Sequence, residues 1–68
     1  MHVMTITYDN LIQDIYGFGS AEEMESAFRT ACSDYGVEPT DVNFDDGFIE
    51  LECGHSICMN FVYQQPKI

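Results

Sequence analysis

Carboxylates gathered between Asp41 and Glu52 are the residues whose type and spacing point most clearly to chemistry. This segment reads DVNFDDGFIELE, and its Asp46-Gly47 pair predicts a two-residue hairpin turn, because a type I′ turn needs positive φ at both central positions. Such a turn places Asp41 opposite Glu52, and directly paired residues share a face. The expected outer surface, with the turn included, comprises Asp41, Asp45, Asp46, Phe48, Glu50 and Glu52.

The negative charge of this predicted surface favours a role in binding. Soluble surfaces generally mix acidic and basic side chains, and a like-charge pair such as Asp41 and Glu52 destabilises a hairpin. Phe48 adds an apolar side chain inside an acidic rim, an arrangement typical of interface hot spots. We therefore expect these six residues to contact a partner that has a basic surface.

The same segment nearly matches a calcium-binding loop. Asp41, Asn43, Asp45 and Glu52 occupy positions 1, 3, 5 and 12 of the EF-hand motif. The glycine required at position 6 is displaced by one residue to Gly47, and a strand pattern follows where the motif needs a helix. A hairpin with acidic flanks is favoured, and a calcium-binding domain is the weaker alternative.

Cys53, His55 and Cys58 are close enough in sequence to suggest zinc, but structural zinc sites need a second pair of ligands. In the expected strand register Cys53 points into the core and Cys58 points outward, so the two thiols do not converge. Cys32 and Cys53 are expected to be small buried hydrophobes. We predict no metal and no cofactor.

Catalysis is not expected either. A nucleophile needs a nearby base that is itself oriented by a third group. His2 lies at the terminus and His55 in a predicted turn, and neither is tied to a serine or cysteine at a recognisable spacing. Glu50 and Glu52 could do acid–base work, but so short a chain leaves little room for a pocket beside a packed core.

Upstream of the acidic segment, the pattern predicts a strand over 2–8, where β-branched residues alternate with period two. Residues 11–16 place apolar side chains on one helical face, which predicts a short helix, with an extension of the strand as the alternative. A longer helix is predicted over 20–35, with Ser20 and Glu23 as a capping box and Gly36 closing it.

Downstream, three antiparallel strands are predicted between Asp41 and Tyr63, and 64–68 is read as a tail. A three-residue turn, Gly54-His55-Ser56, keeps apolar residues on one face, since a slip by one residue would send every side chain to the other face. This register pairs Cys53 with Ile57, Leu51 with Met59, Ile49 with Phe61 and Phe48 with Val62.

Together these elements predict a single α+β domain over 1–68 with two layers. An N-terminal strand and a helical segment are followed by a three-stranded antiparallel meander packed on one amphipathic helix. The first strand is expected to join the sheet, but the pattern leaves its edge open.

Charge and composition narrow the function. The 68 residues carry 12 Asp and Glu against 2 Lys and Arg, a net charge of −10. Direct nucleic-acid binding is excluded, because it needs basic side chains to replace counterions on phosphate. No apolar run approaches the roughly 20 residues of a membrane span, and no signal peptide is visible. The odd number of cysteines, 3, favours a reducing cytoplasm.

In size and charge, including the acidic stretch DVNFDDGFIELE, the chain resembles the small acidic phage-encoded anti-CRISPR proteins and related DNA mimics. The resemblance implies an inhibitor in the cytoplasm of a bacterial host cell. It implies that the protein occupies the basic nucleic-acid-binding surface of a CRISPR-Cas-type defence complex and blocks DNA binding. The alternative is a small structural or regulatory protein, homodimeric through Phe48 and Val62, whose charge serves solubility.

Overall fold

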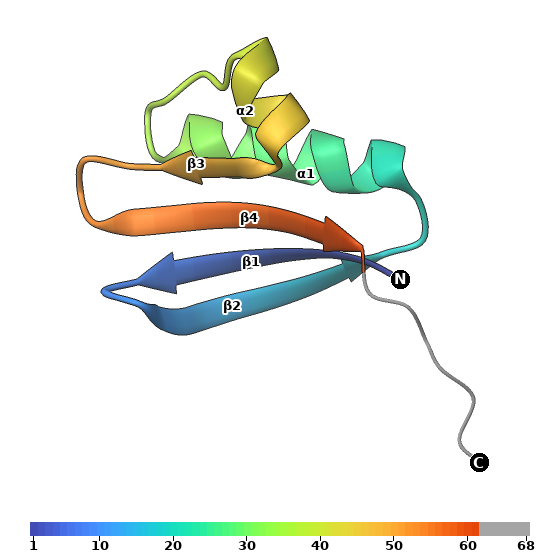
Figure 1. Cartoon of the computed structure of the whole chain (residues 1–68), viewed down its shortest axis with the longest axis horizontal. Helices are drawn as coiled ribbons and strands as arrows, with labels where there is room; N and C mark the ends of the chain where they lie inside the picture. The colour runs from blue at the N-terminus through green and yellow to red at the C-terminus, as the bar shows by residue number, and fades with distance from the viewer. Residues whose placement is uncertain (62–68) are drawn as a thin grey trace.

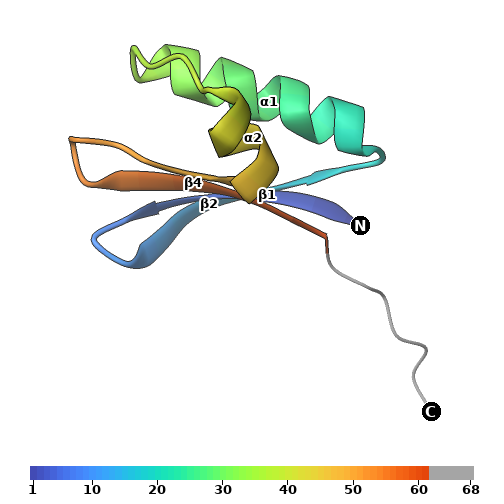
Figure 2. The same ribbon diagram turned by 45° about the horizontal axis from the view of Figure 1, so that its top comes forward.

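The computed structural model describes residues 1–61, which form a four-stranded antiparallel sheet and two helices (Figure 1). The strand order in the sheet is β2-β1-β4-β3. Both helices lie on the same side of the sheet, so the domain has two layers (Figure 2). The elements are β1 (His2–Tyr8), β2 (Leu11–Phe18), α1 (Ala21–Asp34), α2 (Asp41–Asp46), β3 (Phe48–Glu50) and β4 (His55–Phe61). The predicted α+β class is confirmed, but the layout differs: the sheet has four strands and no three-stranded meander, because 11–18 form a strand and 41–46 form a helix.

The strand predicted over 2–8 is confirmed as β1, and it lies inside the sheet rather than at an edge. It pairs with β2 on one side and with β4 on the other, antiparallel in both cases. Met4 and Ile6 point to the helices and are buried, whereas the intervening Thr5 and Thr7 point to the open face. β1 therefore connects the two hairpins of the sheet.

The short helix predicted over 11–16 is wrong, because these residues begin the second strand. Asp9 and Asn10 have φ of 51° and 65°, which are the positive values of a two-residue hairpin turn. Asn and Asp tolerate this conformation better than other non-glycine residues. The turn brings Leu11 opposite Tyr8, and one register shift follows beside Ile6 and Thr7. Pairing with β1 thus overrides the helical spacing of the apolar residues.

The helix predicted over 20–35 is confirmed as α1. Ser20 Oγ accepts a hydrogen bond from the Glu23 N–H at 3.2 Å, and Gly36 follows the helix with φ of 75°. The apolar stripe of α1 is buried on the sheet, where it meets Ile57 and Ile49. Its buried residues are Met24, Phe28, Ala31 and Cys32.

The strand predicted over 41–45 is wrong, because these residues form α2. Thr40 and Asn43 cap it reciprocally: Thr40 N–H donates to Asn43 Oδ1 at 2.9 Å, and Asn43 N–H donates to Thr40 Oγ1 at 3.4 Å. Gly47, with φ of 67°, ends the helix instead of forming a hairpin with Asp46. Its C=O accepts from the Met59 N–H at 2.7 Å, which fixes the end of α2 on β4.

The predicted register of the last hairpin is also wrong, although its faces are correct. Ile49 pairs with Ile57 rather than Phe61, and Phe48 pairs with Cys58. The turn is Glu52-Cys53-Gly54: Leu51 N–H donates to His55 C=O at 2.8 Å, and Gly54 has φ of 97°. The predicted pairs Cys53–Ile57 and Leu51–Met59 are therefore absent from this hairpin.

The register error is a displacement of Ile49 by four residues along β4, an even number, so inward residues stay inward. Ile49, Leu51 and Ile57 are buried accordingly, and Phe48 is exposed on the opposite face. Gly54 decides the turn, since its positive φ suits the last position of a three-residue loop. Val62, the predicted partner of Phe48, lies outside the described residues. So do Tyr63 and the predicted tail 64–68.

Candidate protein-interaction surface

Acidic side chains gather on the helical layer of the domain. Seven of the twelve carboxylates belong to the two helices. Arg29, on α1, is the only Lys or Arg among residues 1–61. The helical layer therefore carries negative charge that its own side chains cannot neutralise. Its acids are Glu22, Glu23, Glu25, Asp34, Asp41, Asp45 and Asp46.

An open groove of about 610 Å³ runs between α1 and α2, and two pairs of carboxylates line it. Glu22 and Glu25 are three residues apart on α1, and Asp41 and Asp45 are four residues apart on α2. Side chains at these spacings lie on one face of a helix, with Cβ atoms about 5–6 Å apart. Each helix thus presents a pair of negative charges to the same groove.

Phe44 and Arg29 also line this groove. The Phe44 ring packs edge-on against buried Phe28, with ring centroids 5.4 Å apart. Arg29 lies over the Phe44 ring, with Cζ 4.9 Å from the ring centroid. A guanidinium stacked on an aromatic ring is attracted by the ring quadrupole. Arg29 is therefore held at the groove and offsets one of its four charges.

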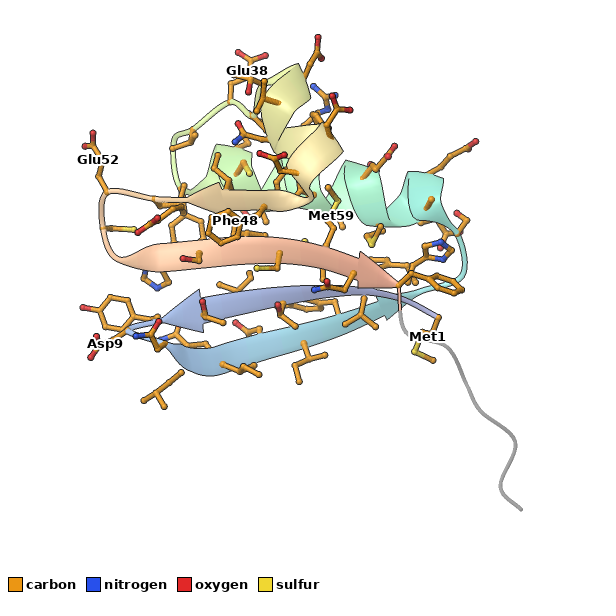
Figure 3. All side chains as sticks on the ribbon, viewed as in Figure 1. Met1, Asp9, Glu38, Phe48, Glu52 and Met59 are labelled. Carbon is orange, nitrogen blue, oxygen red and sulfur yellow. The ribbon has the colours of Figure 1, made fainter. Side chains whose placement is uncertain are left out.

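The structure separates the six residues that the sequence assigned to one acidic face. Asp41, Asp45 and Asp46 lie on α2. Phe48 and Glu50 lie on β3, where pairing with Cys58 and Ser56 places them on the open face of the sheet. Glu52 lies in the turn after β3, at the end of the sheet remote from Met1 (Figure 3).

The sequence prediction missed Glu22 and Glu25 as members of the site. Their place near the start of α1 has a sufficient explanation in the helix dipole, which favours acids there. The signal that could have found them is their spacing of three residues on the side of α1 away from the buried stripe. Only the position of α2 brings Asp41 and Asp45 beside them.

Neither the favoured hairpin with acidic flanks nor the weaker alternative, a calcium loop, forms here, because three of the four motif positions belong to α2. Asp41 and Asp45 lie on one side of α2 and Asn43 on another, because residues two apart in a helix do not face each other, and the Asn43 amide oxygen is occupied by the Thr40 cap. Among residues 1–61, no group of three or more His, Cys, Asp or Glu side chains is arranged to hold a metal ion.

The three cysteines have different surroundings. Cys32 is buried as predicted, and burial raises the pKa of its thiol. Cys58 points outward as predicted and is half-buried, whereas Cys53 is exposed in the turn and not in the core. Its Sγ lies 3.2 Å from Nδ1 of His55. The His55 ring is flanked by Tyr8 and Tyr35, with centroid distances of 4.7 and 4.9 Å.

No protein-family model matches the chain, and neither a curated protein nor a solved structure is significantly similar to it. In the part of the chain that the structure describes, no helix is both long and apolar enough to cross a membrane. The charge and geometry of the domain are therefore the grounds on which a function can be proposed.

Proposed function

We propose that this protein is an acidic binding module whose helical layer occupies the basic, nucleic-acid-binding surface of another protein. The observation that carries the proposal is the groove between α1 and α2, where Glu22, Glu25, Asp41 and Asp45 face one basic side chain, Arg29. Such a surface repels nucleic acid and attracts the Lys and Arg side chains that bind it.

The proposed mechanism is competition for those basic side chains. Carboxylates of the helical layer take the place of DNA phosphates against Lys and Arg of the partner, and charge-assisted hydrogen bonds form at contact. Long-range attraction raises the association rate, and salt weakens the complex by screening it. Bound protein then blocks DNA from the same surface, so the functional outcome is inhibition.

The first partner to test is a CRISPR-Cas-type defence complex of a bacterial cell. The resemblance in size and charge to small acidic anti-CRISPR proteins motivates this choice. Such a complex must hold nucleic acid in a positively charged channel, which is the kind of surface that the acidic helical layer complements.

The test is an affinity pull-down with the tagged protein from bacterial lysate, eluted with rising salt, followed by a gel-shift assay. We expect a nucleic-acid-binding protein to elute at moderate salt, and we expect the added module to displace labelled DNA from it. Recovery of a partner whose DNA binding is unaffected by a saturating amount of the module would contradict the proposal. So would recovery of no basic protein at low salt.

A further inference from the structure

Strand β2 is exposed along almost its whole length, although it belongs to the sheet. Of its eight residues only Phe18 is even partly buried. Four large apolar side chains face solvent: Leu11 is 72 % exposed, Ile12 61 %, Ile15 64 % and Tyr16 45 %. β2 is an edge strand, since β1 is its only neighbour in the sheet order.

Both faces of β2 are open over most of its length, because α1 packs chiefly over β1 and β4 and, of the β2 residues, Phe18 alone packs against the core. Beside β2 an open groove of about 600 Å³ separates α1 from the sheet, with Tyr16 and Phe18 among the residues that line it. No helix covers the opposite face of the sheet in residues 1–61 (Figure 2). Apart from Phe18, which packs against the core, the apolar side chains of β2 are therefore largely open to solvent.

Edge strands of soluble proteins are usually protected by Lys, Pro or short length. β2 has eight residues, contains no Lys, Arg or Pro, and carries one charge, on Asp14. Its only protective feature is the register shift near Gln13, where the strand is bulged against β1. An apolar edge with so little protection is a template for another strand.

We propose that β2 pairs antiparallel with β2 of a second copy, across a two-fold axis between Gln13 and Asp14. This register places Ile12 opposite Ile15 of the second copy and Leu11 opposite its Tyr16. Gln13 then meets Asp14 of the other copy, so an amide faces each carboxylate. The two sheets become one continuous sheet of eight strands.

The pairings with β1 support this register. Ile12 and Ile15 lie opposite Thr7 and Thr5, and both therefore point to the open face. Leu11 and Tyr16 lie opposite Tyr8 and Met4, and both therefore point to the side of α1. Directly opposed residues of an antiparallel pair must share a face, and the proposed register meets this condition for every apolar pair.

Registers displaced by one residue fail the same condition. With the axis at Asp14, the two Asp14 carboxylates face each other, which is unfavourable for like charges. Ile12 then opposes Tyr16 although the two side chains belong to opposite faces. With the axis at Gln13, Leu11 opposes Ile15, again across faces. The bulge makes the strand self-complementary in the proposed register.

Charge and area also favour a second copy as the occupant. The acids are concentrated on the helices, and Asp14 is the only one on β2, so two copies approach along a strand with little like charge. Pairing of the two strands covers part of the four exposed apolar side chains of each copy and the backbone edge of β2, which gives an interface at the small end of the specific size range.

The test is cross-linking of cysteine variants in a Cys53→Ser/Cys58→Ser background that retains buried Cys32. Ile12→Cys and Ile15→Cys proteins are mixed and treated with oxidised glutathione. We expect disulfide-linked dimers in the mixture and little in either variant alone, because the proposed pair lies within the Cα spacing of about 4.4–6.8 Å that a disulfide needs. A mixture of Ile12→Cys with Tyr16→Cys, whose side chains lie on opposite faces, is the matched control.

Sedimentation equilibrium of the unmodified protein provides the second measurement. We expect a monomer–dimer equilibrium that salt strengthens, because screening reduces repulsion between two chains of charge −10. Ile15→Lys should weaken it by about tenfold or more, since each dimer then places two lysines among apolar side chains. A protein that stays monomeric at millimolar concentration, or equal cross-linking in the control mixture, would overturn the proposal.

Discussion

The helical layer and strand β2 of this small domain expose opposite kinds of chemistry. The helical layer presents seven carboxylates and one guanidinium, whereas β2 presents four large apolar side chains and one carboxylate. Charge-driven contacts weaken as salt rises, and apolar contacts between like-charged chains strengthen. A net charge of −10 is therefore shared by two surfaces that we expect to respond to salt in opposite ways.

Disruption of the core that supports both surfaces should have the largest effect, because it lowers the stability of the whole domain. Phe28, on the inner side of α1, is fully buried and packs against Phe44 of α2, and Phe28→Ala should cost about 3–5 kcal/mol of the free energy of unfolding. That is a large part of the roughly 5–15 kcal/mol available to a domain. Urea denaturation measures the loss, with exposed Thr30→Ala on the same helix as control. A loss below that of the control would show that Phe28 is not the centre of the core.

Weakening α2 alone should affect the charged surface and leave β2 unchanged, because α2 belongs only to the helical layer. Thr40→Ala removes the side-chain cap of a six-residue helix, a change worth about 0.5–2 kcal/mol at a helix N-terminus. Hydrogen exchange should show faster exchange of the amides of Phe44 and Gly47, and partner affinity should fall. Self-association through β2 should stay the same. In Thr40→Ser, which keeps a capping hydroxyl, amide exchange and partner affinity should be those of the unmodified protein. Unchanged exchange in Thr40→Ala would contradict this role of the cap.

The smallest expected effect concerns Cys32, which is buried in the core on α1. Burial raises the pKa of this thiol above its ordinary 9.0, so the folded protein holds the proton more tightly than the unfolded chain does. Its contribution to stability is therefore present below pH 9.0 and is lost as pH rises through the higher folded value. Urea denaturation of the protein and of Cys32→Ala across this range should show a steeper decline for the protein. Parallel curves would contradict it.

Much of the fold could be predicted from local pattern. Ser20 and Gly36 mark the ends of α1, and alternation in His2–Tyr8 identifies β1, because these signals act within a few residues. The parity of the last hairpin was also predictable, since Ile49, Leu51 and Ile57 must all face the core.

The secondary-structure predictions were wrong where the same local signal is compatible with two different structures. Gly47 has the positive φ of a hairpin turn, and a helix end needs the same φ. What decides between them is the Thr40–Asn43 cap upstream. Similarly, Asp9-Asn10 could begin a helix or form a turn, and pairing of β2 with β1 decides.

The candidate site was less predictable than the fold because α2 creates it. Asp41 and Asp45 were identified from sequence, but their neighbours on α1, Glu22 and Glu25, follow only from tertiary packing. The exposure of β2 was hidden for a similar reason. Its apolar residues match a buried segment in pattern, and only the placement of α1 over the other strands leaves them in solvent.

The most direct test of the proposed charged interface compares two variants of equal charge as baits in the pull-down. One carries Glu25, Asp45 and Asp46 changed to Lys, which spares the acids in the first turns of the helices. The other carries Glu38, Glu50 and Glu52 changed to Lys, all exposed and outside both helices. Circular dichroism confirms that both are folded.

We expect the protein and the second variant to recover the same basic nucleic-acid-binding partner and the first variant to lose it, because position on the helical layer matters beyond net charge. Equal loss by both variants would show that net charge alone attracts the partner. Full recovery by the first variant would show that the helical layer is not the interface. Either result would contradict the proposal that acids of the helical layer bind the partner.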